Sequence, residues 1–262
     1  MKKMIEQIER GKQNRPRRML LYGTAGIGKS SFGAMAERPI FLATEDGLDS
    51  IECDRFPMVR TLDQFKEAVT ALLQEEHSYQ TAVVDSADWL ERITWDDVCR
   101  EHGVKAIESI PYAKGYTFAL SKWEGILRGL DALRDRRGMA VILIAHAKME
   151  RFENPETEPY DRYAPRLHKH ASALIQEWAD AVLFAAFKVH TRKVGEKFGQ
   201  DLHKGIGTGE RVIRTTERPG HLAKNRLGLP DEMPLDYRAY AAEVKRLTNP
   251  DNNNPQQQVK NH

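Results

Sequence analysis

Short apolar runs alternate along the chain with longer segments in which apolar residues recur every three or four positions. The first pattern is typical of buried strands, and the second of helices that cover them. The expected strands cover residues 19–23, 39–44, 81–86, 139–147 and 180–189. The expected helices cover residues 30–37, 61–77, 87–102, 117–138, 171–179 and 235–247. Because strands and helices take turns, we expect an α/β fold with a mostly parallel sheet flanked by helices.

Two segments interrupt this alternation. Residues 150–170 are polar and contain prolines, so we expect them to form a loop. Residues 195–216 are rich in glycine and predict a C-terminal β-hairpin.

We expect one large domain over residues 17–247 with an appendage at each end. Residues 1–16 predict a short helix and a basic linker, and residues 248–262 form a polar tail of low complexity that we expect to be disordered. The helix could dock on another copy of the chain or cap its own domain. Its apolar face carries Met1, Met4, Ile5 and Ile8.

Composition narrows the class of protein. The chain has 262 residues, of which 40% are hydrophobic and 30% charged, as in a water-soluble globular domain. Its net charge of +2 does not by itself indicate a nucleic-acid partner. Cys53 and Cys99 are too far apart for a zinc ribbon or disulfide framework, which favours a reducing cytoplasm. No apolar run approaches the roughly 18 residues of a membrane span, so we expect no membrane association.

The stretch LLYGTAGIGKSSFG, residues 20–33, places three glycines within six residues and follows them with Lys-Ser-Ser. It fits the pattern G-x-x-x-x-G-K-S/T of a phosphate-binding loop, with the required strand before it and helix after it. The loop amides would bind phosphate oxygens, Lys29 would neutralise their charge, and Ser30 would ligate Mg²⁺. The residues expected to hold the nucleotide are Gly23, Thr24, Ala25, Gly26, Ile27, Gly28, Lys29, Ser30 and Ser31.

Such a loop needs a carboxylate for Mg²⁺ at the end of a neighbouring strand. Asp85 ends the apolar run TAVVD and meets this requirement, although an aspartate here could also simply cap the next helix. Many phosphate-loop ATPases carry an acid directly after this aspartate, whereas this chain has Ser86. The group that activates water must then lie elsewhere. Glu45 after the second strand is our candidate, with Asp46 as its competitor.

Four further stretches follow in the order and spacing of the RecA-like ATPase core: FLATEDGLD, AVVDSADWL, VILIAHA and LAKNRLGLP. Residues 17–235 resemble, more closely, the compact phage-encoded RecA-like proteins of recombination and single-strand annealing. The resemblance implies that Glu45 is the catalytic carboxylate and that Asp85 holds Mg²⁺ through water. It also places Asp49 where an acidic residue can meet the adenine.

His146 ends the most apolar expected strand, where RecA-like proteins carry a polar sensor of the γ-phosphate, most often glutamine. A neutral imidazole could donate one hydrogen bond to phosphate and contact residues 147–170 through its other nitrogen. The alternative is a histidine that is satisfied within the fold at a strand end.

Lys224 and Arg226 lie two residues apart after a strand and a turn, so on extended chain they would face one side. In RecA-like rings and filaments, cations at this place reach the γ-phosphate of the neighbouring subunit. The resemblance therefore implies a homo-oligomer, a ring or filament, with ATP at its subunit boundaries. Solvated surface charge is the alternative, because basic pairs are common in this chain.

Two loops combine cations with aromatic rings, the parts that a single-strand DNA site needs. They lie near residues 107–118 and within 147–170, where RecA-like proteins face their DNA channel. A polar surface loop without DNA contact is the alternative. The residues expected to contact DNA are Tyr112, Lys114, Tyr116, Arg162, Tyr163, Arg166 and Lys169.

Three functions fit these observations. The first is an ATP-hydrolysing, oligomeric protein that binds single-stranded DNA for phage-type recombination or annealing in the host cytoplasm, with a single-strand DNA-binding protein as a possible partner. The second is a hexameric helicase or translocase, which the lack of a recognisable extra domain disfavours. The third is an annealing scaffold that uses ATP for assembly alone. The absence of N-K-x-D disfavours a GTPase, and no segment resembles the substrate lid of a small-molecule kinase.

Overall fold

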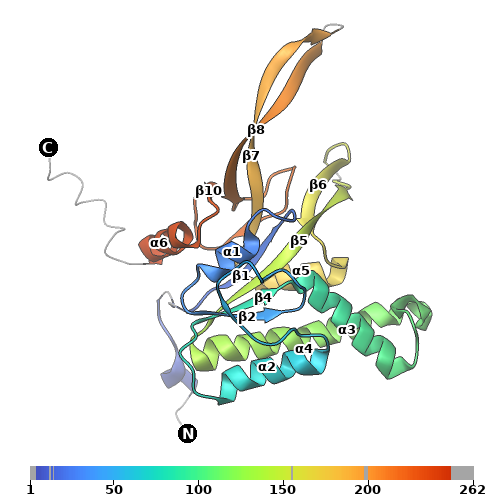
Figure 1. The fold of residues 1–262 in the computed structure, drawn as a ribbon, viewed down its shortest axis with the longest axis vertical. Helices are drawn as coiled ribbons and strands as arrows, with labels where there is room; N and C mark the ends of the chain where they lie inside the picture. The colour runs from blue at the N-terminus through green and yellow to red at the C-terminus, as the bar shows by residue number, and fades with distance from the viewer. Residues whose placement is uncertain (1–3, 12, 14, 155, 198–199, 249–262) are drawn as a thin grey trace, which may run out of the picture.

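In the described part of the chain, a ten-stranded sheet carries helices on both faces (Figure 1). The computed structural model describes residues 4–11, 13, 15–154, 156–197 and 200–248. The strands are β1 (Arg18–Gly23), β2 (Pro39–Ala43), β3 (Asp54–Arg55), β4 (Thr81–Asp85), β5 (Ala140–Phe152), β6 (Tyr160–Pro165), β7 (Ala181–Lys197), β8 (Gln200–Arg214), β9 (Lys224–Asn225) and β10 (Glu232–Pro234). The helices are α1 (Lys29–Ala34), α2 (Leu62–Gln74), α3 (Ala87–His102), α4 (Lys114–Arg137), α5 (Lys169–Trp178) and α6 (Tyr237–Thr248), with 3₁₀ turns η1 (Met4–Gln7), η2 (Ile107–Ser109) and η3 (Pro111–Ala113).

The strand order is β10-β8-β7-β1-β5-β4-β2-β3, with β6 paired to β5 and β9 to β7. Strand β1 pairs in parallel with both β5 and β7, and the β5–β4–β2–β3 half is also parallel. Strands β8 and β10 extend the sheet in antiparallel fashion. The expected mostly parallel α/β sheet with a hairpin near the C-terminus is confirmed.

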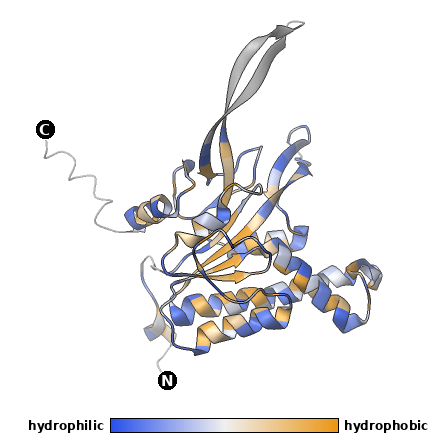
Figure 2. Ribbon diagram, viewed as in Figure 1, coloured by the Kyte–Doolittle hydropathy of each residue, from blue (hydrophilic) through white to orange (hydrophobic). Residues whose placement is uncertain are grey.

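Successive side chains of each central strand point to opposite faces of the sheet, so the core around the sheet has two layers. In β1, Leu20 and Tyr22 pack with α2, α3, α4 and α5, whereas Met19 and Leu21 pack with α1 and α6 on the other face. Both sets are buried, which explains why parallel strands appear as continuous apolar runs in the sequence. Figure 2 shows these strands as the most hydrophobic part of the molecule.

Local signals fix several helix ends. Thr61 and Gln64 form a reciprocal capping box at the start of α2. Helix α4 ends at Gly138, whose φ of 65° is readily available to glycine. Helix α2 is shorter than expected, because the chain turns extended at Glu75.

The polar loop expected over residues 150–170 is wrong in part. Strand β5 continues past the core to Phe152, and β6 returns antiparallel beside it. Charged cross-strand neighbours such as Glu150 and Arg162 hold this hairpin together. Because this hairpin stands out from the core, residues 148–152 of β5 and the strand β6 carry no continuous apolar run, and the hydrophobic pattern gave no sign of them (Figure 1).

Strands β7 and β8 form a second, longer hairpin that projects from the body of the molecule (Figure 1). At the other end of the chain, the expected N-terminal helix is a single 3₁₀ turn, η1. Met4, Ile5 and Ile8 are 82%, 80% and 64% exposed, so this face does not cap its own domain. Met1 and the tail from residue 249 lie outside the described residues.

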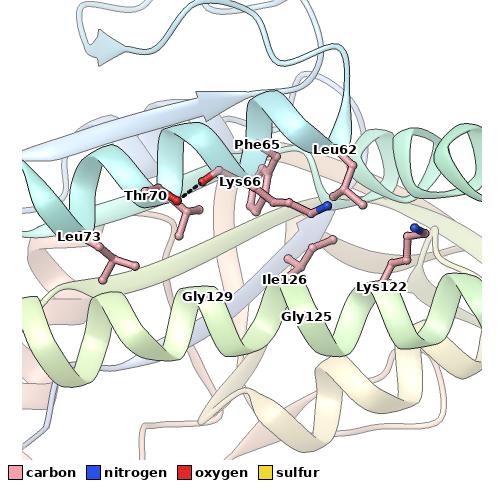
Figure 3. Close-up of a pocket in the computed structure, with 10 residues that line it drawn as sticks. Leu62, Phe65, Lys66, Thr70, Leu73, Lys122, Gly125, Ile126 and Gly129 are labelled. Atoms are coloured by element: carbon pink, nitrogen blue, oxygen red, sulfur yellow. Dashed lines mark hydrogen bonds between the residues drawn. The ribbon is translucent and has the colours of Figure 1, made fainter.

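A shallow apolar groove of about 310 Å³ lies between α2 and α4, on the helical layer (Figure 3). Leu62, Phe65 and Val69 of α2 face Ile126 of α4 across it, and Gly129 leaves room between the two helices. None of the described helices is long and apolar enough to cross a membrane.

Candidate functional site

A polar cleft of about 310 Å³ opens where the parallel strands end. The loop after β1 forms one wall, and the segment after β2 forms the other. The residues lining the cleft are Gly26, Gly28, Lys29, Ser30, Ser31, Glu45, Asp46, Gly47, Leu48, Ile51, Asp85, His146 and Arg211. Ligands of open α/β sheets bind at this edge, where strands and helices diverge.

The three glycines of the loop have different roles. A Cβ on Gly23 would lie 2.4 Å from the backbone oxygen of Ala185, so this glycine lets β7 pack against β1. Gly26 and Gly28 have φ values of 73° and 107°, a region that side chains other than glycine rarely adopt. Two of the glycines therefore shape the loop, and the first seats it in the sheet. Ile27 between them points into the core and is fully buried.

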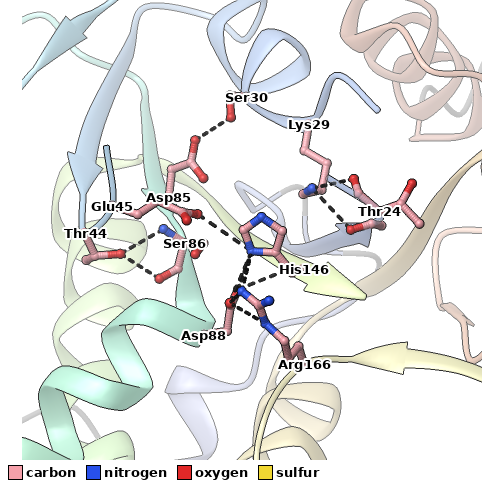
Figure 4. Close-up of polar contacts among 11 residues, drawn as sticks. Thr24, Lys29, Ser30, Thr44, Glu45, Asp85, Ser86, Asp88, His146 and Arg166 are labelled. Atoms are coloured by element: carbon pink, nitrogen blue, oxygen red, sulfur yellow. Dashed lines mark hydrogen bonds and ion pairs between the residues drawn. The ribbon is translucent and has the colours of Figure 1, made fainter. Parts of the chain in front are cut away.

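Lys29 is 6% exposed, and its ammonium group lies within the loop (Figure 4). Its Nζ donates to the backbone oxygens of Gly23 at 3.2 Å and Thr24 at 2.9 Å. Burial lowers the pKa of Lys29, while the carboxylates of Asp85, Asp88 and Glu45 oppose this shift. A buried cation held at the loop carbonyls can donate to the phosphate oxygens of a ligand that enters the loop.

Ser30 and Asp85 meet across the cleft. The hydroxyl of Ser30 donates to Oδ2 of Asp85 at 2.6 Å, and Asp85 is 5% exposed at the end of β4. Burial raises the pKa of Asp85, although the hydrogen bond from Ser30 opposes the shift. The hydroxyl and carboxylate oxygens are hard ligands of the kind Mg²⁺ prefers. No group of three or more His, Cys, Asp or Glu side chains able to hold a metal occurs among the described residues, so Mg²⁺ here would need phosphate and water oxygens as well.

Thr44 fixes the spacing between the two carboxylate-bearing segments (Figure 4). Its hydroxyl donates to the backbone oxygen of Ser86 at 2.7 Å and accepts from the backbone N–H of Ser86 at 2.8 Å. Its own N–H donates to the oxygen of Asp85. This clamp places Glu45, the next residue, beside Asp85 at the cleft. The sequence offered no sign of it beyond a polar residue at a strand end.

His146 lies on β5 between Glu45 and a buried acid that we did not anticipate, Asp88 (Figure 4). Its Nδ1 lies 3.8 Å from Oε1 of Glu45 and 3.2 Å from both carboxylate oxygens of Asp88. The backbone N–H of His146 also donates to Asp88 at 2.9 Å. His146 is thus held in place by Asp88 of α3, and it lies within β5 rather than at the end of a strand.

Arg166 completes this cluster from the segment after β6. Its Nε donates to Oδ2 of Asp88 at 3.0 Å, and its Nη2 contacts the same oxygen at 2.5 Å. Burial alone would raise the pKa of Asp88, but hydrogen bonds from His146 and Arg166 outweigh it and hold that pKa well below its usual range. The carboxylate of Asp88 therefore links the cleft to the β5–β6 hairpin.

Two expected residues lie in settings that the sequence did not indicate. Asp49 pairs with Arg55 at 3.0 Å and is not among the residues that line the cleft, so its contact with adenine stays a prediction. Lys224 is not a free cation: its Nζ donates to the backbone oxygens of Gln176, Glu177 and Ala179 and caps the end of α5.

Arg226, unlike Lys224, is exposed, and its side chain has no hydrogen bond or ion pair within the described part of the chain. Between the two, the side chain of Asn225 bonds the loop at Leu229. The expected pair of outward cations is therefore reduced to Arg226.

The residues expected to contact DNA fall into two groups. Arg162 is committed to Glu150 and Glu217 and lies over the Phe152 ring. Tyr163 stacks on Phe184 at 5.1 Å and is partly buried. Arg166 binds Asp88 but is exposed, so all three side chains have partners within the fold, and their contact with DNA stays a prediction.

The remaining group is available at the surface. Tyr112 is 91% exposed, and the ammonium of Lys114 lies 5.9 Å from its ring centroid. Tyr116 donates to Glu108 and stacks on His168 with ring centroids 4.3 Å apart. This stack joins the start of α4 to the start of α5, where Lys169 is exposed. The two predicted loops therefore meet, although with fewer free cations than expected.

The parallel sheet, its loop of the form GTAGIGKS and the acid at the end of β4 define a P-loop ATPase domain of RecA-like type. A family model described as an AAA domain, AAA_24, matches residues 15–227. The chain belongs to this family.

A curated relative is the SPbeta prophage-derived uncharacterized protein YorG of Bacillus subtilis (strain 168), which is 25% identical over 229 residues. The match covers 84% of this chain and 62% of that protein, so this chain spans about three-fifths of its relative's length. Among solved structures, the RadB recombinase matches with a TM-score of 0.44 and 12% identity, over 86% of this chain and 90% of RadB.

Proposed function

We propose that this protein binds and hydrolyses ATP with Mg²⁺ and couples the nucleotide to single-stranded DNA in an oligomer. The observation that carries the proposal is the contact between Ser30 and Asp85 beside the buried Lys29, with Glu45 on the opposite wall of one cleft. These are the parts that phosphoryl transfer needs: a cation, oxygen ligands and a carboxylate that can face the terminal phosphate.

In the proposed reaction, the loop amides and Lys29 hold the triphosphate. Mg²⁺, held by Ser30 and Asp85 together with the phosphates, would neutralise developing charge on the phosphate oxygens. Glu45 accepts a proton from a water molecule, whose oxygen forms a bond to the γ-phosphorus. The bond from that phosphorus to the bridging oxygen breaks, and ADP and phosphate leave. His146 contacts the γ-phosphate and, through Asp88 and Arg166, reports its presence to the β5–β6 hairpin.

The assembly is proposed on two features. Arg226 is exposed without a partner in the described chain, so it is the cation that we assign to the γ-phosphate of an adjacent subunit. Met4 and Ile5 are more than three-quarters exposed, which favours contact of this segment with a second copy. Arg226→Ala should then reduce ATP hydrolysis while preserving assembly, whereas a double change of Met4 and Ile5 to Ser should reduce the particle mass in light scattering.

The DNA surface is proposed at the junction of α4 and α5. Tyr112 offers a fully accessible ring for base stacking, and Lys114 and Lys169 offer charges for phosphate. Because neither feature reads base edges, we expect binding to be largely independent of sequence. The curated relative is prophage-derived, which agrees with a phage origin, and we propose phage DNA recombination or strand annealing as the role of this surface.

The decisive experiment measures phosphate release and annealing by the parent and by Glu45→Gln. We expect the variant to bind ATP and to lose hydrolysis by about two orders of magnitude or more, as for loss of a catalytic base. If annealing survives in the variant, ATP serves assembly alone, and the coupled mechanism is wrong. If the parent neither binds ATP nor releases phosphate, the whole proposal fails.

The DNA surface has a separate test in fluorescence anisotropy with a labelled oligo-dT strand. Replacing Lys114 with Ala should weaken binding and make the slope of log K against log salt shallower by about 0.7, the value for one lost phosphate contact on a single strand. Lys245→Ala, an exposed lysine on α6, is the matched control and should leave the slope unchanged. An unchanged slope in the Lys114 and Lys169 variants would remove this surface from the proposal.

A further inference from the structure

One cation in the cleft is not among the site residues that the sequence predicted. Arg211 lies in β8, and its guanidinium reaches the phosphate-binding loop from the base of the long hairpin. A Cβ on Gly28 would lie 3.0 Å from its Nη1. The backbone oxygen of Arg211 accepts the N–H of Leu235, which ties this point of β8 to the segment after β10.

Arg211 differs from the other cations around the cleft because its side chain has no partner among the described residues. Lys29 donates to loop carbonyls, and Arg166 is bound to Asp88. The guanidinium of Arg211 is exposed to the cleft and makes no hydrogen bond or ion pair with any residue that the structure describes. A guanidinium beside a phosphate-binding loop, with its donors unused, is suited to bidentate contact with phosphate oxygens.

The sheet holds Arg211 at a fixed place relative to the loop. Gly23 of β1 pairs with Ala185 of β7, and Ala185 pairs in turn with Ile213 of β8. Arg211 is two residues from Ile213, so two hydrogen-bonded ladders separate it from the first residue of the loop. Its position therefore does not depend on a flexible connection.

We propose that Arg211 binds the phosphate chain of the nucleotide in cis, as part of the same subunit's site. This inference rests on the proposed function, because it assumes that the cleft binds a nucleoside triphosphate. It adds a second cation to the site and connects the base of the β7–β8 hairpin to the bound phosphates.

The test compares Arg211→Gln with Arg214→Gln, which removes a charge from the same strand outside the cleft, where Arg214 lies 3.9 Å from Glu232. Binding of fluorescent ATP is measured by titration, and inorganic tripolyphosphate is used as a competitor that has phosphates but no base. Loss of a charged hydrogen bond to phosphate weakens binding by about tenfold or more. We expect that loss for both ATP and tripolyphosphate in Arg211→Gln, partial recovery in Arg211→Lys, and parental affinity in Arg214→Gln.

Three outcomes would contradict the proposed contact between Arg211 and the phosphates. Parental affinity in Arg211→Gln, with Lys29→Ala impaired, would overturn this inference and leave the proposed function intact. Weaker ATP binding with unchanged tripolyphosphate competition would assign Arg211 to the base or ribose, and would also overturn it. No ATP binding by the folded parent would remove the proposed function itself. Melting curves of each variant establish that the comparison is made between folded proteins.

Discussion

Glu91 shows how the environment of one side chain sets its charge. It lies on α3, is 4% exposed, and both carboxylate oxygens accept the backbone N–H of His168. Burial raises its pKa to about 7, although the bond from His168 and the charge of Lys148 oppose the shift. An ordinary glutamate would ionise near 4.5, so the folded protein holds a proton that the unfolded chain has released.

This shift predicts a pH dependence of stability. The stabilising contribution is fully present below about pH 4.5 and is lost as the pH rises through about 7, because ionisation then places a charge in the core. Glu91→Gln keeps an acceptor for the His168 N–H but does not ionise. The difference in the free energy of unfolding between this variant and the parent should therefore shift in the variant's favour as the pH rises from 5 to 8.5. We expect that shift to be up to about 3 kcal/mol.

Urea unfolding at both pH values measures this difference. Glu67→Gln, at an exposed position of α2, is the control and should follow the parent at both pH values. Parallel profiles for the parent and Glu91→Gln would show that Glu91 ionises normally in the folded state.

Lys224 illustrates a residue whose partners lie far away in sequence. Its ammonium bonds three backbone oxygens at the end of α5, which would otherwise lack donors. We predict that Lys224→Ala lowers the free energy of unfolding by about 2 kcal/mol, the scale of hydrogen bonds to a charged group. Thermal unfolding measures the loss. Arg226→Ala should leave the melting temperature unchanged, and a fully stable Lys224→Ala variant that fails only in hydrolysis would restore the trans-acting role.

At the scale of elements, the close approach of β1 and β7 depends on Gly23. A methyl group there would lie 2.4 Å from a backbone oxygen that cannot move away as a side chain would. Gly23→Ala should therefore cost about 1–3 kcal/mol of stability, as overpacking does, and disturb the loop that follows. Gly220→Ala has no atom within 4 Å of the added Cβ and serves as the control in the same melting experiment. Equal melting temperatures would mean that the sheet relaxes at no cost.

The sequence predicted those elements whose cause is local. Helix α3 has the expected bounds, residues 87–102, and β4 ends at Asp85 as the apolar run indicates. Likewise, the loop from Gly23 to Ser30 is defined by its own spacing. Strand β6 was missed, because cross-strand charges rather than an apolar run stabilise it.

In the site, the missed residues are those that the folded sheet brings in from a distance. Asp88 belongs to the site because it forms hydrogen bonds with His146 and Arg166, which lie 58 and 78 residues further along the chain. Arg211 reaches the loop from β8. No spacing rule along the sequence can anticipate contacts of this kind, whereas Lys29, Ser30 and Asp85 follow from patterns next to a strand end.

At the scale of the whole molecule, ligand binding should appear as added stability. If ATP with Mg²⁺ binds the folded chain alone, a concentration about 100 times the dissociation constant raises the free energy of unfolding by about 2.7 kcal/mol. We expect a corresponding rise in melting temperature for the parent and none for Lys29→Ala. Lys105→Ala, an exposed lysine outside the cleft, should respond as the parent does. An equal rise in melting temperature for Lys29→Ala would show that ATP binding does not depend on the lysine of the loop.

Strand β7 runs without interruption from its pairing with β1 into the projecting hairpin. If the subunits of an assembly are related by one symmetry operation, their hairpins project at the same angle to the symmetry axis and at regular intervals. Averaged electron micrographs would then show a regular fringe, whose spacing reports the rise of a filament or the number of subunits in a ring.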